Sequence, residues 1–103
     1  MTDLPVPVAQ SEQASAIRHR LGEGLAKIDP HHRLCGRPVA YRIIDGTMLE
    51  IAYRDVPGIA EAEVLGVKRL IGVECFCTVA PQTAETVIVR FVVSLKTQRV
   101  TQP

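Results

Sequence analysis

The feature that most constrains the fold is a long alternating apolar segment near the end of the chain, residues 86–96. Its apolar side chains recur at a spacing of two: Val87, Val89, Phe91, Val93 and Leu95. This period is typical of a β-strand with one buried face. The opposite face is only half polar, because it includes Ile88 and Val92. We therefore predict a central strand that is covered on both sides for part of its length.

Residues 11–28 have the apolar spacing of an amphipathic helix. The apolar positions step by three or four residues: Ala14, Ile17, Leu21, Leu25 and Ile28. We predict that Ser11 caps the start of this helix and that Asp29 and Pro30 end it. Gly22 and Gly24 weaken its interior, at a cost of about 1 kcal/mol each relative to alanine.

A β-hairpin is the strongest local prediction. Two β-prone segments, residues 39–44 and 47–53, flank Asp45-Gly46, a pair that favours a two-residue type I′ turn. That turn would pair Ile43 with Met48, Tyr41 with Glu50 and Ala40 with Ile51. The more apolar face would then carry Ala40, Ile44, Leu49, Ile51 and Tyr53. Arg42 would lie on the wrong side, so either its side chain reaches an edge or the loop is longer and the register shifted.

The segment from residue 55 to residue 71 is ambiguous. Its apolar stripe favours a helix capped by Asp55, whereas Pro57, Gly58 and Gly66 also allow a turn followed by a strand. Residues 73–80 are strand-like, and residues 81–84 would connect them to the final strand as an antiparallel hairpin.

The predicted fold class is therefore α+β, in the order α-β-β-α-β-β. We expect a two-layer sandwich with a four-stranded, mostly antiparallel sheet and two helices on one face, as in a ferredoxin-like chain whose first strand has moved to the end. Its 103 residues suit one domain. We predict flexible tails over residues 1–10 and 97–103.

This arrangement leaves one face of the sheet uncovered. The side chains expected there are partly apolar: Val39, Met48, Ala52, Ile88 and Val92. An apolar face of this kind predicts a homodimer or binding to another protein, with Met48, Ile88 and Val92 in the interface.

Composition and charge limit which other classes of partner, and which compartment, the sequence favours. The formal net charge is +1 and only four residues are aromatic, Trp being absent, which disfavours nucleic acid as a partner. The longest apolar runs are too short to span a membrane, and no secretory signal is visible. Three cysteines, an odd number, fit a reducing compartment, so we expect a cytoplasmic protein.

One loop combines side chains that could carry chemistry. His31, His32 and Cys35 lie within five residues, and Cys75 and Cys77 share a strand face. Together they could supply zinc ligands, although their spacing is not that of structural zinc sites, and buried thiols with solvated histidines are the simpler interpretation. A nucleophilic Cys35–histidine pair is the enzymatic version of this hypothesis.

A basic set in the same region includes Arg33, Arg37 and Arg42. It could bind phosphate, an acidic partner or RNA, but a solvated loop beside a helix C-terminus explains it more simply. No motif fixes a reaction or a cofactor. The sequence thus favours a small cytosolic protein-binding, assembly or regulatory module, homodimeric and without catalytic activity. The alternative is a metal-binding protein or small enzyme that uses the histidine and cysteine residues.

Overall fold

The computed structural model describes residues 8–95 of the chain and has an α+β fold. The elements follow the predicted order: α1 (Val8–Ile28), β1 (Val39–Ile44), β2 (Met48–Val56), α2 (Glu61–Ile71), β3 (Cys75–Pro81) and β4 (Val87–Ser94). Flexible tails were predicted over residues 1–10 and 97–103; residues 1–7 and 97–103 lie outside the described residues, whereas residues 8–10 belong to α1. Within residues 8–95, no helix is long and apolar enough to cross a membrane.

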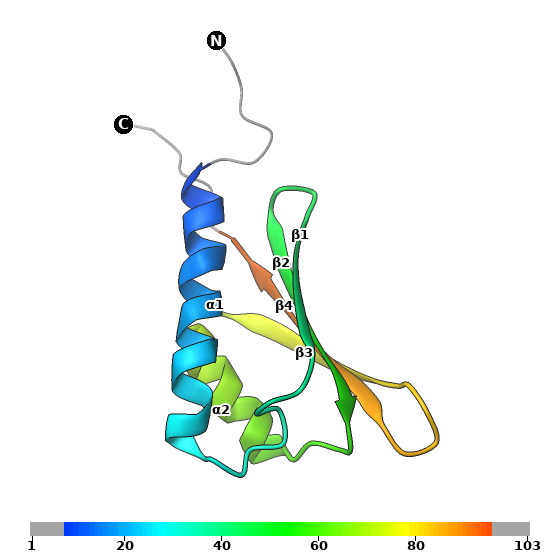
Figure 1. The fold of residues 1–103 in the computed structure, drawn as a ribbon. Helices are drawn as coiled ribbons and strands as arrows, with labels where there is room; N and C mark the ends of the chain where they lie inside the picture. The colour runs from blue at the N-terminus through cyan, green and yellow to red at the C-terminus, as the bar shows by residue number, and fades with distance from the viewer. Residues whose placement is uncertain (1–7, 96–103) are drawn as a thin grey trace.

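The four strands form one sheet in the order β1-β2-β4-β3, and every neighbouring pair is antiparallel. The prediction that the last strand is central is confirmed, because β4 lies between β2 and β3. Both helices lie on the same side of the twisted sheet, and the other side is left open (Figure 1). Strands β1 and β3 are the two edges.

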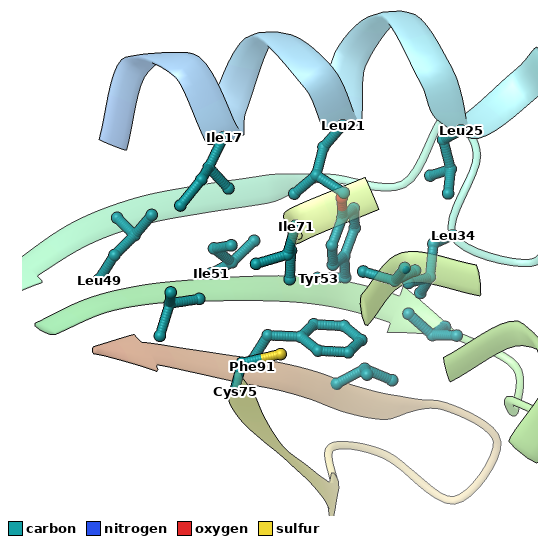
Figure 2. Close-up of a cluster of buried hydrophobic side chains, with 14 of the residues drawn as sticks. Ile17, Leu21, Leu25, Leu34, Leu49, Ile51, Tyr53, Ile71, Cys75 and Phe91 are labelled. Carbon is teal, nitrogen blue, oxygen red and sulfur yellow. The ribbon is translucent and has the colours of Figure 1, made fainter. Parts of the chain in front are cut away.

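The hydrophobic core fills the space between the helices and the sheet (Figure 2). Alternation along β4 works as predicted, since Val89, Phe91 and Val93 are fully buried. From β2 the core receives Leu49, Ile51, Tyr53 and Val56, and from the helices Ile17, Leu21, Leu25, Val67 and Ile71. Phe91 packs edge-on against Tyr53, with ring centroids 6.5 Å apart. The core thus joins α1 and α2 to one face of the sheet.

The first helix is longer than its sequence pattern indicated. It begins at Val8, so Ser11 lies inside the helix and the prediction that Ser11 caps it is wrong. The end is as predicted, because the helix stops at Ile28, just before Asp29 and Pro30. Ile28 itself is 50% exposed and does not join the core. The apolar stripe therefore ends one turn before the helix does.

Helix α2 begins later than predicted, at Glu61, with Ala60 as its N-cap. Asp55 does not cap it, because Asp55 lies near the end of β2. Its φ is 59°, and it sits where the register between β2 and β4 shifts. A hydrogen-bond pair holds this bulge: the backbone N–H of Asp55 donates to the Gln82 side chain, and Gln82 donates back to the carboxylate of Asp55, both at 2.8 Å. The helical interpretation of the ambiguous segment is confirmed for residues 61–71.

Helix α1 also completes the C-terminus of α2. The guanidinium of Arg20 donates to the carbonyl oxygens of Leu70 and Ile71, at 2.9 and 2.6 Å. Gly72 follows in the left-handed conformation, and its N–H donates to the carbonyl of Lys68. These bonds satisfy carbonyl groups that a helix end would otherwise leave without partners.

The hairpin register differs from the prediction by one residue. Ile43 pairs with Leu49, Tyr41 with Ile51, and Arg42 with Glu50. Asp45 and Gly46 do adopt the positive φ values expected of the turn, but Thr47 is an extra residue in the loop, and its carbonyl accepts a hydrogen bond from Leu95. A shift of one residue exchanges the two faces of a strand.

The shift changes which side chains of β1 contact the core. Tyr41 and Ile43 pack against it, and the prediction that Ala40 and Ile44 do so is wrong. Arg42 consequently points away from the core, which removes the conflict noted in the predicted register. Val39 shares the core side with Tyr41, so its predicted place on the uncovered face is also wrong.

Candidate interaction surface

The sheet face opposite the helices combines apolar side chains from all four strands. The pairings place Arg42, Glu50, Val92 and Phe76 in one row across the sheet, and Ala40, Ala52, Arg90 and Thr78 in the next. We call this surface the open sheet face. Its apolar members are Ala40, Ile44, Met48, Ala52, Phe76, Ala80, Ile88 and Val92. The three interface residues predicted from sequence, Met48, Ile88 and Val92, all lie on it, each partly buried.

A charged group lies at the centre of the open sheet face. Glu50 accepts a hydrogen bond from Arg42 at 2.9 Å on one carboxylate oxygen, and Arg90 lies 3.7 Å from the other. The Glu50 side chain is only 18% exposed, whereas the two arginines extend further into solvent. One carboxylate thus organises two cations from neighbouring strands. Such solvent-facing ion pairs contribute at most about 1 kcal/mol each to the free energy of unfolding. Their main effect is to set the arrangement of charge on the open sheet face.

The outer edge of β3 adjoins this face and is uncharged from Cys75 to Pro81. Three large apolar side chains on or beside this strand are exposed: Phe76 by 71%, Val79 by 50% and Val73 by 40%. We call Val73, Phe76 and Val79 the β3 strip; Phe76 lies on the open sheet face, whereas Val79 lies on the same side of β3 as Cys75 and Cys77. Phe76 was not among the predicted interface residues. The signal was present, because burial of Cys75 and Cys77 on one face of a strand places Phe76 on the other.

The loop that carries the two histidines is held by one of them. His32 is buried, and both of its ring nitrogens have partners: Nδ1 accepts from the N–H of Leu34 at 3.2 Å, and Nε2 lies 3.0 Å from the carbonyl of Glu63. Because Nδ1 accepts, Nε2 carries the proton and donates to α2. His32 therefore joins the loop to α2, and neither nitrogen is free to ligate a metal or to activate Cys35. His31 is exposed.

The cysteines do not converge. Cys35 lies beside Tyr41 and Tyr53 near β1, whereas Cys75 and Cys77 belong to β3 at the opposite edge of the sheet. All three are free thiols. No group of three or more histidine, cysteine or acidic side chains within residues 8–95 is placed to hold a metal ion. The zinc hypothesis gains no set of ligands from this arrangement.

The environment of the thiols also disfavours a nucleophilic role. Burial raises the pKa of Cys35, and the charge of Asp29 raises it further. Burial likewise raises the pKa values of Cys75 and Cys77, against an opposing influence from Lys68. Since the thiolate is the reactive form, none of these cysteines has the lowered pKa of an activated nucleophile.

The three predicted phosphate-binding arginines have separate partners. Arg33 contacts the carboxylate of Glu63 at 3.3 Å, and Arg37 donates to the carbonyl oxygens of Arg33 and Asp55. Arg42 lies on the open sheet face with Glu50. The structure therefore does not bring the three guanidinium groups together around one ligand.

A small cavity of about 180 Å³ lies between α1, the loop and β1. Its walls include the polar groups of Cys35, Tyr41 and Tyr53. Burial raises the pKa of Tyr41, and for Tyr53 burial and the adjacent Tyr41 act in the same direction. The cavity is therefore lined by neutral hydroxyl and thiol groups. Arg37 borders it, although its guanidinium already donates to backbone carbonyls.

Comparison of the chain with protein-family models, with curated proteins and with solved structures gave no match. The functional interpretation therefore depends on the geometry of the residues themselves. Of the surfaces described above, the open sheet face and the β3 strip carry exposed apolar side chains at and beside a sheet edge.

Proposed function

We propose that this protein is a small assembly module that acts as a homodimer and has no catalytic activity. The observation that carries the proposal is the β3 strip, beside an open sheet face, on an edge strand without charge. Exposed, uncharged edge strands pair readily with other chains, and natural proteins usually protect them. Association of two copies would remove this surface from water.

The site chemistry supports an assembly role over an enzymatic one. The buried imidazole of His32 is engaged at both nitrogens, and the cysteines have raised pKa values. An activated nucleophile needs an adjacent base and a lowered pKa. These residues show the opposite: no ring nitrogen of His32 is available as a base, and the pKa values of the cysteines are raised. Three free thiols also fit a reducing environment, so we propose a cytoplasmic location.

The open sheet face offers a second role within the same proposal. In a dimer that associates through an edge, Met48, Ile88 and Val92 would stay accessible to another protein. The charges of Arg42, Glu50 and Arg90 would orient such a partner, because complementary charges set register more than affinity.

Sedimentation velocity over a range of protein concentrations tests self-association. We expect a monomer–dimer equilibrium, and we expect Phe76→Lys to weaken it at least tenfold, because the ammonium would have to be desolvated in the interface. The matched control is Leu65→Lys, at a position that is 45% exposed and lies on α2 and not on the β3 edge. A protein that stays monomeric at all concentrations would contradict the proposal, as would equal effects of the two substitutions.

A further inference from the structure

We infer that two copies of this chain pair through their β3 edges, antiparallel, with the two-fold axis passing at Cys77. The two sheets would then form one continuous sheet of eight strands. This inference rests on the proposed homodimeric function and specifies its interface.

The direction of the backbone groups follows from the hairpin between β3 and β4. The N–H of Gln82 donates to the carbonyl of Thr86, so Gln82 points toward β4. Backbone direction alternates along a strand. Cys75, Cys77, Val79 and Pro81 therefore direct their backbone groups away from β4, to the outside of the sheet. Pro81 has no N–H, and it sits where none is needed for the β3–β4 ladder.

Among residues 8–95, no hydrogen bond outside the regular ladders involves the outward backbone groups of Cys75, Cys77 and Val79. A second copy of the same strand is complementary to them. With the axis at Cys77, Cys77 faces itself and Cys75 faces Val79 of the second copy, so every outward N–H meets an outward carbonyl. An axis at Val79 would instead oppose Cys77 to Pro81, which cannot donate, and an axis at Cys75 would oppose Val79 to a residue of α2. An axis at Phe76 would pair Cys75 with Cys77 but oppose Val79 to a residue outside β3, and an axis at Thr78 would oppose Cys75 to Pro81. Of these registers, the one with its axis at Cys77 satisfies the outward groups of Cys75, Cys77 and Val79 most completely.

The side chains are compatible with the same register. On the open sheet face, Phe76 would lie opposite Thr78 of the second copy, and aromatic side chains pair well with β-branched neighbours across strands. No two like charges are opposed. The two Glu74 side chains would be offset by six residues, about 20 Å along an extended chain, so their repulsion is screened.

The interface is small. It consists of one strand pair and the β3 strip, below the area of a stable obligate dimer. Main-chain hydrogen bonds supply much of the affinity in strand addition. We therefore expect a weak dimer in rapid exchange with monomer, with a Kd on the order of ten micromolar or above.

Cross-linking with dibromobimane, which bridges two neighbouring thiols, tests the position of the axis. Opposed residues of a hydrogen-bonded antiparallel pair have Cα atoms about 5.5 Å apart. A protein that retains only Cys77, made by replacing Cys35 and Cys75 with alanine, should form a covalent dimer. A protein that retains only Cys35 should not, because Cys35 lies near the opposite edge of the sheet. Because burial raises the pKa of Cys77, the reaction is run at an alkaline pH at which monobromobimane labels this thiol in the folded protein. Absence of the Cys77 cross-link under these conditions, at concentrations where the dimer is populated, would overturn the inference.

A second pair of variants tests the edge without using the thiols. Val79→Pro removes an outward N–H and blocks the strand edge, whereas Val79→Thr keeps the N–H and the branched side chain. We expect the Kd of the dimer to rise at least tenfold for Val79→Pro and to stay unchanged for Val79→Thr. If Val79→Pro dimerises normally while Val92→Lys does not, the dimer forms through the open sheet face, and the edge inference fails although the proposed function stands. A wild-type protein that remains monomeric contradicts both the edge inference and the proposed function. If Val79→Pro does not fold, the Cys77 cross-link decides.

Discussion

Two glycines in the same helix should respond in opposite ways to the same substitution. Gly22 and Gly24 both lie in the interior of α1, so replacing either by alanine gains the same intrinsic helix propensity, about 1 kcal/mol. Their surroundings differ. A Cβ atom at Gly22 would meet nothing within 4 Å, whereas at Gly24 it would lie 2.7 Å from Cδ2 of Leu70 and 3.5 Å from Cδ1.

These distances set the expected free energies. Gly22→Ala should raise the free energy of unfolding by about 1 kcal/mol, because no contact opposes the gain. Carbon atoms pack at about 3.5–4.0 Å, so Gly24→Ala requires Leu70 to move by about 1 Å at the boundary between the helices. The opposing atom is the end of a side chain, but Leu70 packs against the core, which restricts its rotation, so we assign the usual overpacking cost of about 1–3 kcal/mol. The net effect of Gly24→Ala is therefore a loss between zero and about 2 kcal/mol.

Urea unfolding followed by far-UV circular dichroism measures this difference. The two variants should have the same m-value, and their urea midpoints should move in opposite directions from wild type. In thermal unfolding the corresponding change in Tm is about 4–8 °C per kcal/mol. Equal stabilisation by both substitutions would show that α1 and α2 are not in close contact at Gly24. It would refute the packing that we describe between the helices.

Two further predictions concern the loop between α1 and β1. His32→Ala should lower the free energy of unfolding by about 2–4 kcal/mol, because it leaves the N–H of Leu34 without its partner and opens a cavity, whereas the exposed His31→Ala should change it by less than about 0.5 kcal/mol in the same urea titration. For Glu63, burial alone would raise the pKa, but hydrogen bonds from the backbone of Ala60 and Arg33, with the nearby positive charge, outweigh it and hold the pKa below its usual value of 4.5. A lowered folded-state pKa contributes stability that is complete above the unfolded pKa and is lost as the pH falls through the folded one, so wild type should lose more stability than Glu63→Gln between roughly pH 5 and pH 3. A Gln variant with an unchanged pH profile would contradict this role.

Much of the fold was predictable because its signals are periodic. The alternation in β4 gave both the strand and its buried face, since five apolar side chains agree on one side. The helical period gave the core residues Ile17, Leu21 and Leu25 of α1. Such patterns report burial directly, so they identify elements that pack across a single core.

The boundaries and the hairpin register were less predictable, for a physical reason. Asp45-Gly46 correctly indicated positive φ at two positions, but the turn sequence does not reveal that the carbonyl of Thr47 accepts a hydrogen bond from Leu95, just beyond β4. That contact is tertiary, and it adds the residue that shifts the register. Asp55 shows the same limit, because Gln82 from a distant loop holds it in a bulge rather than at a helix cap.

The candidate sites show the same contrast between local patterns, which the sequence reveals, and tertiary contacts, which it does not. His31, His32 and Cys35 are adjacent in sequence, but the partners of His32 come from α2, which the loop sequence cannot specify. The exposure of Phe76, in contrast, follows from local alternation once Cys75 and Cys77 are placed in the core, whereas Val79 shares the face of the cysteines and is exposed although alternation would bury it. What the sequence could not supply was the position of β3 at an edge, because strand order depends on the whole topology.

The contrast between the two sheet edges favours β3 as the self-association strand. Edge strands are commonly protected by charge. The β1 edge carries Arg42, which is ion-paired to Glu50, and the guanidinium of Arg18 lies 5.1 Å from the Tyr41 ring on the same strand. Strand β3 has no such side chain between Cys75 and Pro81, and it exposes Phe76. Since the chain protects one edge with cations and leaves the other uncharged, an encounter between two copies should select the β3 edges, where pairing requires no charge to be desolvated.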